Sequence, residues 1–582
     1  MATPRFGAWL DHDGARFRLW APSASRVDLL IDGVPASPMS RDAVGVFTAS
    51  LPGLTKGTRY RYRLDAGEPI PDPASHWQPD GVHGASALDD ARAFAWHASP
   101  VPLAPRDLII YELHTGTFTP EGTFDAARER LPYLRDLGVT AIELMPVAEF
   151  AGSRNWGYDG AALYAPSSAY GGPDALRRFV DAAHAHGLAV LLDVVYNHLG
   201  PDGAYLHAAS PAFFTPDAAS PWGAAVDVAN PVVREWLIAN AIHWAEDFNV
   251  DGFRLDATHA LPQASAPAFI RDLVIGTRAA TGRPLVFIAE DHRKIPAMLQ
   301  PASPASPASN DGWALDAVWA DDFHHHVRVM TAGDRHGYYA SYSGRARDLA
   351  ATIAGGWDGF PPAESGHGRF VICIQNHDQI GNRARGDRLH HAEPLDAWRA
   401  ASALLLLAPE TPLLFMGQEW AASTPFLYFT DHHGELGRLV SEGRRREFRD
   451  FPAFHGNAGV PDPQAAPTFA ESKLRWEERE RPPHAGVLAL YRALLSLRRS
   501  ERLVQPQVLA MDDVTIGIRY PSLAVVARLK GAGRIDRPSW LDANWRVELT
   551  TEDAGFGGGA PPSLADDAMT FGGPAAVIFR RG

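Results

Sequence analysis

This chain of 582 residues has very little cysteine and no excess of positive charge. Cys373 is the only cysteine, so no disulfide can form within the chain and an oxidising compartment is not implied. The formal net charge of −14 argues against nucleic acid or an anionic membrane as the main partner. The sequence also has no membrane-length apolar run and no signal-like start. We therefore expect a cytoplasmic protein that binds neither nucleic acid nor membrane.

Several signatures of common enzyme chemistry are missing as well. The sequence contains no G-x-S-x-G nucleophile elbow and no G-x-x-x-x-G-K-[ST] phosphate loop. The polar residues that stand out below include neither a cysteine nor a His-x-x-x-His pair, which makes them a poor transition-metal site. We expect no metal ion and no cofactor.

What the sequence does contain is a division into three structural parts. Residues 1–90 consist of short strand-like runs between Gly, Pro and Asp turns, which predicts an immunoglobulin-like β-sandwich. Residues 91–105 are the expected linker. Residues 106–499 alternate short apolar strands with amphipathic helical stretches, which predicts an α/β fold, a (β/α)₈ TIM barrel with loop insertions. Short strands return over 500–582, so we expect a C-terminal antiparallel β-domain.

Eight strands are predicted for the barrel. They are "DLIIYEL" (107–113), "TAIELMPV" (140–147), "LAVLLDVVYNH" (188–198), "DGFRLDA" (251–257), "PLVFIAED" (284–291), "DAVWADDF" (316–323), "FVICIQNHD" (370–378) and "PLLFMGQEW" (412–420). The piece "VLALYRALLSLRR" (487–499) is the expected last helix. The low-complexity run "PASPASPASN" (301–310) is expected to be a loop after the fifth strand.

Polar side chains follow four of these strands, at the ends where TIM barrels carry their functional groups. They are Asp193, Asn197 and His198, then Arg254 and Asp256, then Glu290, and finally Asn376, His377 and Asp378. Corresponding ends of strands in one barrel should converge on a single cavity. Opposed carboxyls suit the cleavage of a glycosidic bond, in which one carboxylate attacks the anomeric carbon and a protonated partner donates to the leaving oxygen.

Four of these segments resemble, in order and spacing, the conserved regions of the α-amylase superfamily of glycoside hydrolases: "DVVYNH" (193–198), "DGFRLDATH" (251–259), "FIAED" (287–291) and "IQNHDQIGN" (374–382). The resemblance implies a retaining enzyme with Asp256 as nucleophile and Glu290 as general acid/base. Asp378 would bind the hydroxyls of the sugar in subsite −1. Arg254 leaves the strand on the same face as Asp256 and can pair with it.

The same resemblance implies further contacts to the sugar in subsite −1. They are His198 and His377 as donors and Tyr158 of "NWGYDG" as the platform beneath the ring, with Trp156, Asp193 and Asn197 as additional candidates. Asn197 sits where many amylases place a calcium ligand. Calcium needs six to eight oxygen ligands, and the acids of the short insertion at 200–230 are scattered, so we expect no bound calcium.

More specific segments resemble the maltooligosyltrehalose trehalohydrolases within this superfamily. They are "PDPASHWQPDGVHGAS" (71–86), "WADDFHHHVRV" (319–329), "NHDQIGNRARGDRL" (376–389) and "PFLYFTDHHGELGRLVSEGRRREF" (425–448). The one departure is His76-Trp77, where Arg-Phe is expected. The resemblance implies a carbohydrate-binding-module-like N-terminal domain. It also implies hydrolysis of the α-1,4 bond beside the terminal trehalose of maltooligosyl trehalose, which releases trehalose and a maltooligosaccharide. A maltooligosyltrehalose synthase would be the functional partner.

Loops after the later strands would shape subsites +1 and +2 around the kinked trehalose. Sugar C–H faces pack on aromatic rings, so the candidate platforms there are Phe323, Trp420 and Tyr428. The candidate polar contacts are His324, Gln379, Arg383 and Asp431.

Three alternatives remain open from sequence. The first is a branching or debranching enzyme acting on α-1,6 bonds, although branching enzymes usually have a Ser-His-Asp-Glu run where this chain has Asn376-His377-Asp378-Gln379. The second is a non-catalytic glucan-binding barrel, which the presence of all three acids disfavours. The third is independent glucan binding by the N-terminal sandwich through Trp20 or Trp77, whose more ordinary role is packing.

Overall fold

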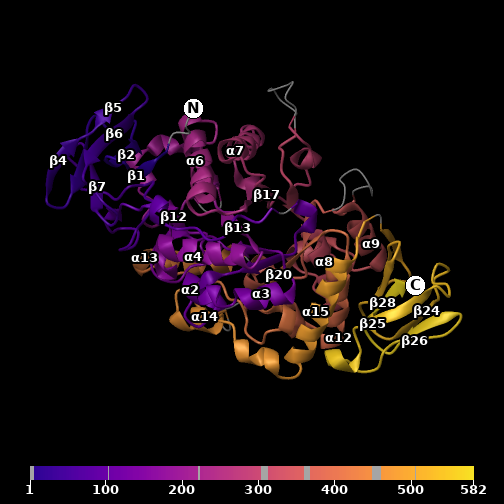
Figure 1. Cartoon of the computed structure of the whole chain (residues 1–582). Coiled ribbons are helices and arrows are strands. Elements are labelled where there is room, and N and C mark those ends of the chain that lie inside the picture. Colours follow the sequence, from indigo (N-terminus) through magenta and orange to yellow (C-terminus); the bar gives the residue numbers. More distant parts are fainter. Residues whose placement is uncertain are drawn as a thin grey trace.

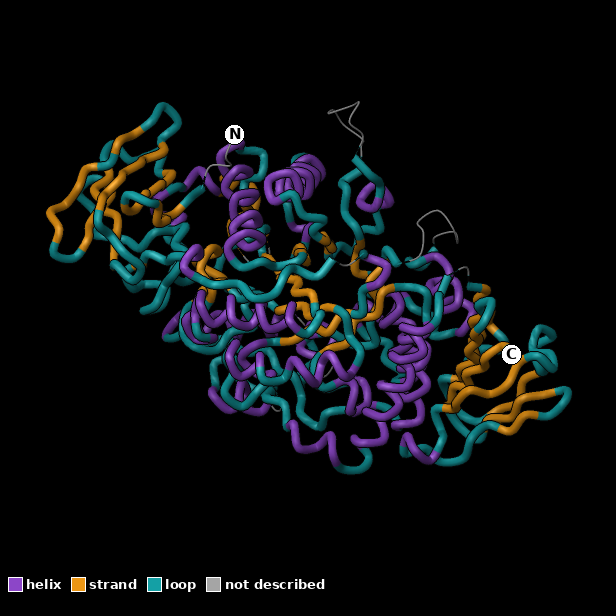
Figure 2. The backbone as a smooth tube through the Cα atoms, in the orientation of Figure 1, coloured by secondary structure: helices purple, strands orange, loops and turns teal. Residues whose placement is uncertain are grey.

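The computed structural model describes residues 5–102, 104–220, 223–302, 312–359, 368–447, 460–504 and 506–582. The N-terminal strands, indigo in Figure 1, lie at one end of the molecule, and the C-terminal strands, yellow, lie at the other. Between them, helices surround a central set of strands (Figure 2). Most of the low-complexity run at 301–310 lies outside the described residues.

The N-terminal part is a sandwich of two antiparallel sheets, as predicted. One sheet has the order β1 (Gly7–Asp11), β2 (Gly14–Trp20), β6 (Val46–Pro52), β5 (Ser40–Arg41), and the other has the order β4 (Val34–Pro38), β3 (Val27–Ile31), β7 (Arg59–Leu64), β8 (Ser86–Ala87). Alternating residues such as Phe17 and Leu19 of one sheet and Leu29 and Tyr62 of the other fill the core between them. Trp20, at the end of β2, is buried in the main core of the molecule and not between the two sheets, and it donates to the carbonyl of Val44, so its ring is a packing residue.

The middle of the chain is a closed barrel of eight parallel strands, which confirms the TIM-barrel prediction. Its strands are β9 (Ile110–Leu113), β10 (Ala141–Leu144), β13 (Ala189–Val194), β16 (Gly252–Leu255), β17 (Val286–Ala289), β18 (Ala317–Trp319), β19 (Phe370–Ile372) and β20 (Thr411–Phe415). Seven of them lie inside the segments predicted from sequence, and β20 begins one residue before its predicted segment.

Helices follow the strands around the outside of this barrel (Figure 1). They are α2 (Phe124–Arg128), α3 (Leu131–Leu137), α4 (Gly172–Ala185), α6 (Pro231–Asp247), α7 (Ala266–Thr281), α8 (Asp322–Thr331), α9 (Ala346–Gly355), α12 (Leu395–Leu407) and α15 (His484–Ser500). The last contains the predicted helix 487–499. Further elements lie in the connections: α1 (Thr115–Phe118), β11 (Ala148–Phe150), β12 (Gly160–Pro166), α5 (Leu206–Ala209), β14 (Phe214–Ser220), β15 (Gly223–Val226), α10 (His377–Gly381), α11 (Leu389–Ala392), α13 (Gly434–Glu447) and α14 (Ala466–Glu471).

The barrel interior is apolar at one end and charged at the other. Residues such as Ile110, Leu191 and Ile288 form a separate apolar cluster that draws on seven of the strands. Strand side chains alternate between faces, so the residue two positions further along each strand also points inward. On β9 and β13 that residue is Glu112 and Asp193. The polar layer therefore sits directly above the apolar layer, at the C-terminal ends of the strands.

Local sequence explains why α6 starts and ends where it does. The Asn230 side chain accepts a hydrogen bond of 3.0 Å from the Val232 N–H, and Pro231 occupies the first helical position, both of which favour a helix start. Trp236 and Trp244 are buried in the main core. Fixing α6 in this way also fixes the start of β16, which carries the central charges of the site.

The C-terminal part is antiparallel, as predicted. A five-stranded sheet has the order β21 (Gln507–Ala510), β22 (Thr515–Arg519), β23 (Leu523–Arg528), β28 (Ala575–Arg581), β25 (Trp545–Thr550), and a three-stranded sheet has the order β24 (Gly533–Asp536), β27 (Ala568–Phe571), β26 (Ser563–Leu564). Residues of β23 and β28 pack on α12. The domain boundaries at residues 90, 105 and 499 stay predictions.

Ion pairs attach the sandwich to the barrel. Arg177 of α4 is buried and donates to both oxygens of Asp89, which follows β8, and to the carbonyl of Asp247 at 3.0 Å. Arg18 of β2 lies 3.0 Å from Glu235 of α6. Among the described residues, none of the helices has both the length and the hydropathy required to cross a bilayer.

Candidate active site

Arg254 is the centre of the polar layer at the C-terminal ends of the strands. Its guanidinium is fully buried and donates from Nη1 to Asp193 Oδ2 and to Asp256 Oδ1, both at 2.8 Å. Its Nη2 donates to Glu290 Oε2 at 2.7 Å. The ring of Trp319 lies 4.3 Å from the guanidinium carbon, a cation–π contact. One side chain therefore holds three carboxyl groups from three neighbouring strands.

Glu290 directly follows β17, and its surroundings favour the protonated form of its carboxyl group. Burial raises its pKa to about 8, an effect that Arg254 opposes and that Asp256 and Asp378 reinforce. The backbone N–H of Ala257 donates to Glu290 Oε2 at 3.0 Å. Ala257 has a positive φ of 39°, so the chain turns sharply after Asp256 and aims this N–H at Glu290. At neutral pH Glu290 is mostly protonated.

Asp256 follows β16 and is held through both carboxyl oxygens. Oδ1 accepts from Arg254, and Oδ2 accepts from Asn197 Nδ2 at 2.9 Å. The same amide also donates to the Asp256 carbonyl at 2.9 Å. Asn197 therefore orients the Asp256 carboxyl, in place of the direct sugar contact predicted as one of its roles.

His377 and Asp378 follow β19 at the start of α10. Although burial opposes it, the carboxylates of Asp378 and Glu112 raise the pKa of His377 to about 9. Its Nδ1 lies 2.5 Å from Glu112 Oε1, and its Nε2 lies 3.5 Å from Asp378 Oδ2. Asn382 donates to Asp378 Oδ1 at 3.0 Å. The Asp378 side chain is 35% exposed, more than those of Asp256 and Glu290, so it has room to meet a ligand.

Tyr158 links the two halves of the site. Its hydroxyl lies 2.8 Å from His377 Nε2 and donates to Asp193 Oδ2 at 2.6 Å. Burial raises the pKa of Asp193 to about 6, with Arg254 opposing this and Asp256 adding to it. His198 Nε2 lies 3.0 Å from the Tyr158 carbonyl, and its Nδ1 contacts Asn197 Oδ1. The predicted subsite −1 residues therefore form one hydrogen-bonded group.

Two predicted sugar platforms are wrong because their rings are fully buried. Phe323 on α8 and Trp420 at the end of the short helix η8 (Gln418–Trp420) are both 0% exposed. Trp420 packs against Tyr133 and Trp476, with ring centroids 6.2 and 5.2 Å away. Neither ring offers a face to a sugar, so both act in packing.

Other candidates are occupied by the protein itself. Trp156 is buried, donates to the Leu427 carbonyl at 2.9 Å and stacks on Phe426, which corrects its prediction as a direct sugar contact. His324 is also buried, with its ring nitrogens 2.7 Å from the Ile374 carbonyl and 3.1 Å from the Tyr339 hydroxyl. It is therefore corrected to a structural residue.

Asp431 belongs to a contact between two loops. It accepts from Ser153 N–H at 2.8 Å and from the Arg154 guanidinium, and it is 7% exposed. It therefore ties the loop between β11 and β12 to the loop after β20, and the predicted substrate contact is not supported. Tyr428 remains partly exposed, with the Arg444 guanidinium 4.5 Å above its ring.

Gln379 and Arg383 lie close to Asp378 on the same segment. The Tyr339 hydroxyl donates to Gln379 Oε1 at 3.3 Å, and Arg383 Nη1 donates to Asp334 at 3.0 Å. Beside them, Tyr338 of η7 (Gly337–Ser341) is 42% exposed, and its hydroxyl donates to Gln379 Oε1 at 3.5 Å. Sequence reasoning missed Tyr338 because no motif surrounds it.

Glu112, Glu143 and Asp321 were also missed. Glu112 binds both the backbone N–H and Nδ1 of His377. Asp321 follows β18, and burial together with the charge of Asp378 raises its pKa to about 7. Glu112 and Glu143 lie within apolar strand runs, as Arg254 does, and this was the signal that would have found them.

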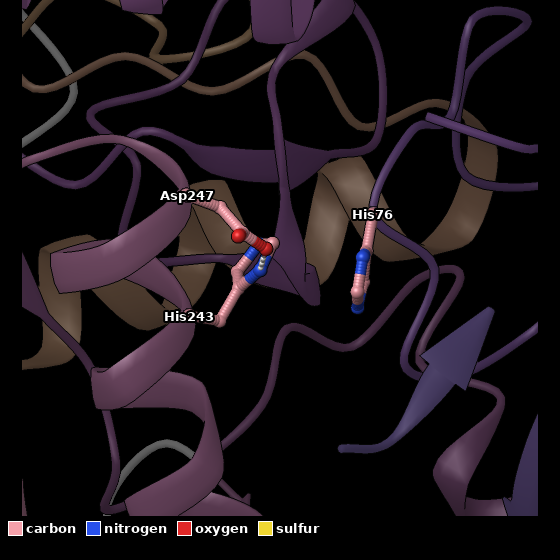
Figure 3. Close-up of side chains that lie close together, drawn as sticks. All are labelled: His76, His243 and Asp247. Atoms are coloured by element: carbon pink, nitrogen blue, oxygen red, sulfur yellow. Dashed lines mark hydrogen bonds and ion pairs between the residues drawn. The ribbon is translucent and has the colours of Figure 1, made fainter. Parts of the chain in front are cut away.

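One group of the described side chains has the composition of a metal site, at the junction of sandwich and barrel: His76, His243 and Asp247 (Figure 3). His243 Nδ1 lies 2.9 Å from Asp247 Oδ2, and its Nε2 lies 2.9 Å from the Tyr164 carbonyl. Burial and the neighbouring His243 lower the pKa of His76 to about 3, and its ring packs against His243 with centroids 4.3 Å apart. We interpret the group as a hydrogen-bonded structural contact between the two domains.

The α-amylase catalytic domain model matches residues 111–217, and the model of carbohydrate-binding module 48 (isoamylase N-terminal domain) matches residues 5–77. The malto-oligosyltrehalose trehalohydrolase of Deinococcus radiodurans is 47% identical over 84% of this chain and 81% of its own length. That of Saccharolobus solfataricus is 39% identical over 87% of this chain and 89% of its own length. A 1,4-alpha-glucan branching enzyme of Vibrio parahaemolyticus is 35% identical over only 43% of this chain and 37% of its own length.

Solved structures agree with this pattern. The crystal structure of a Salmonella typhimurium protein classed with the α-amylases has a TM-score of 0.89 and 36% identity and covers 99% of each chain. A Group B Streptococcus pullulanase has a TM-score of 0.77 at 19% identity, with 100% of this chain and 88% of that one covered, which shows a shared fold. The chain therefore belongs to the malto-oligosyltrehalose trehalohydrolase family of glycoside hydrolases, within the α-amylase superfamily.

Proposed function

We propose that this enzyme hydrolyses the α-1,4-glucosidic bond beside the terminal trehalose of maltooligosyl trehalose, with retention of anomeric configuration. The observation that carries the proposal is the binding of Asp256 and Glu290 to the two terminal nitrogens of one buried guanidinium. A retaining pair requires two carboxyl groups about 5–5.5 Å apart, and a shared Arg254 keeps the two groups close. The relatives over most of the chain carry the trehalohydrolase name.

In the first step, an Asp256 oxygen attacks the anomeric carbon while the bond from that carbon to the trehalose oxygen breaks. Glu290 transfers its proton to the departing oxygen and becomes a carboxylate. In the second step, Glu290 takes a proton from water, the water oxygen bonds to the anomeric carbon, and Asp256 is released. Glu290 thus regains its proton, and the products are trehalose and a maltooligosaccharide.

The remaining polar residues act on the sugar in subsite −1. Asp378 is the most exposed of the three acids and is proposed to bind the hydroxyls of that sugar. The imidazolium of His377 is proposed to donate to a hydroxyl when the sugar displaces its contact with Tyr158. His198 is a second proposed donor, and the Tyr158 ring is the proposed platform. Asp193 acts through Arg254, because both its oxygens accept from that guanidinium.

On the leaving-group side, the proposed trehalose contacts are those predicted residues that the structure leaves close to Asp378 or partly exposed: Gln379, Arg383 and Tyr428. Tyr338 is added to them because it presents an exposed ring next to Gln379. The N-terminal sandwich is proposed to support the barrel. A maltooligosyltrehalose synthase is the proposed supplier of substrate, and the cytoplasm is the proposed location.

Product analysis tests this function. The protein is incubated separately with maltotriosyl trehalose, maltopentaose and a branched α-glucan, and the products are separated by chromatography. We expect trehalose and maltotriose from the first, much slower cleavage of the second, and little release from the third. Dominant release of linear chains from the branched glucan, or formation of new branches, would instead establish the branching or debranching alternative.

A further inference from the structure

Glu143 is a buried acid on β10 for which neither the fold nor the proposed reaction has yet given a use. It is 1% exposed, and neither carboxyl oxygen has a hydrogen-bond partner among the described residues. It lies two positions after Ala141, which belongs to the apolar interior cluster of the barrel, so strand alternation points it into the interior. An ionised carboxylate buried without a partner is too costly to persist.

The neighbours of Glu143 explain why no cation is available to it. Glu112 lies directly opposite in the register of β9 and β10, and Asp193 projects from β13 on the other side. Two cations of the described residues, His377 and Arg254, face this layer, and both are already bound. His377 pairs with Glu112, and Arg254 pairs with Asp193 as well as with Asp256 and Glu290. Among these acids, Glu143 is the one without a hydrogen-bonded partner.

We propose that Glu143 is a positioning residue that stays protonated during the reaction and thereby leaves His377 bound to Glu112 and Arg254 bound to Asp193. Ionised Glu143 would compete for both cations and draw them away from subsite −1. This inference rests on the proposed function, in which His377 binds the sugar and Arg254 binds the two catalytic carboxyl groups.

Burial raises the pKa of Glu143 well above its ordinary value, and the charges of Glu112 and Asp193 raise it further, while Arg254 and His377 oppose them. A carboxyl whose pKa is raised on folding stabilises the protein at low pH, and that stability is lost as pH rises toward the folded-state pKa. The loss begins once the unfolded chain ionises, above about pH 4.5. Above neutral pH, Glu143 therefore makes the protein progressively less stable than a variant with a neutral side chain there.

Glu143→Gln tests the protonation state without reference to any substrate. The folding equilibrium constants of wild type and variant are measured by urea unfolding from pH 5 to pH 9. We expect the ratio of variant to wild type to rise with pH, by up to about tenfold per pH unit for as long as Glu143 stays protonated in the folded state, and to level off above its folded-state pKa. A ratio independent of pH would show that Glu143 is ionised in the folded state and would overturn the proposal. Glu143→Met, which is also neutral, replaces the Gln variant should the latter fail to fold, with the same expected slope.

The role of Glu143 in the reaction is tested separately, by the kinetics of Glu143→Gln on maltotriosyl fluoride. Maltotriosyl fluoride needs no proton on its leaving group, so its cleavage is less sensitive to the titration of Glu290. With this substrate we expect Glu143→Gln to keep kcat and KM within about threefold of wild type at pH 7 and to move the alkaline fall of kcat to higher pH. A loss of more than tenfold in kcat at pH 7, or an unmoved alkaline fall, would overturn the positioning role. Failure of the proposed function would appear as inactivity of the wild type, whereas the unfolding measurement would still report on Glu143.

Discussion

Replacing Glu290 by Gln puts an amide of nearly the same shape, which cannot transfer a proton, in place of the carboxylic acid, and this makes it the sharpest perturbation of the proposed mechanism. With a pKa of about 8, Glu290 is roughly 90% protonated at pH 7, whereas an ordinary glutamic acid would be protonated in about 1 of 300 molecules. Burial in this site thus increases the population of the acid by about 300-fold. General acid catalysis contributes about 10²–10⁴-fold in rate, and a sugar oxygen is a poor leaving group, so we expect a loss near the upper end.

The assay compares two leaving groups. With maltotriosyl trehalose, Glu290→Gln should lower kcat/KM by about 10³–10⁴-fold, because the trehalose oxygen must leave without a proton. Fluoride leaves without protonation, so the rate of the first step with maltotriosyl fluoride should fall by less than about tenfold. Wild-type kcat/KM on maltotriosyl trehalose should also decline as pH rises through about 8, since the acid form is then lost, and this decline should vanish in the variant.

Asp378→Asn is the matched control. Asp378 is proposed to contact the sugar in subsite −1, which both substrates share, so its replacement should slow both by a similar factor. An equal loss on both substrates in Glu290→Gln would refute the reasoning, because it would mean that Glu290 does not act on the leaving group.

Three further predictions follow from named contacts. Asp256→Asn should lower kcat by several orders of magnitude and leave the dissociation constant for maltotriosyl trehalose within about threefold, as measured by calorimetry, because only transition-state interactions are lost; near-wild-type turnover would reject its role. Exhaustive chelation should leave activity unchanged, and a loss that calcium restores would contradict the expectation of a calcium-free enzyme. Trp420→Ala should cost about 3–5 kcal/mol in free energy of unfolding with little change in KM; a large rise in KM at unchanged stability would show that its ring meets the sugar.

The sequence predicts the barrel well because each strand has the same two-part pattern. Apolar residues such as those of "LAVLLDVV" satisfy a strand buried on both faces, and the polar residue that follows marks the end where groups converge. The convergence of Asp256, Glu290 and Asp378 follows from topology alone, so no knowledge of side-chain contacts is needed to anticipate it. Their proposed roles come from the family resemblance.

The roles of the loop residues are harder to predict from sequence, because the partners of these residues lie far away along the chain. Asp431 is bound by Ser153 and Arg154, separated from it by 278 and 277 positions, and nothing near Asp431 announces them. Phe323 lies in the first turn of α8, whose inward face is set by packing against the barrel, so sequence cannot tell whether its ring faces a ligand or the core. Aromatic residues in loops are therefore weak predictors of sugar platforms.

The acids within the strands can be recognised from sequence, because each is a charged residue inside an apolar run. Arg254 stands out because a charge occurs inside an apolar strand, and Glu112 and Glu143 satisfy the same criterion. Strand alternation alone places both in the barrel interior. Which of them is protonated depends on the positions of His377 and Arg254, which only the three-dimensional structure supplies.

Trapping the glycosyl-enzyme tests the central claim most directly. In Glu290→Gln, maltotriosyl fluoride should glycosylate the nucleophile, and the missing general base should slow its release, so the intermediate should accumulate. Trypsin cleavage after Arg254 and Arg271 gives a peptide, residues 255–271, in which Asp256 is the only acidic residue. Mass spectrometry should find one maltotriosyl group on this peptide. A label on any other peptide, or none while fluoride is still released, would contradict the assignment of Asp256 as nucleophile.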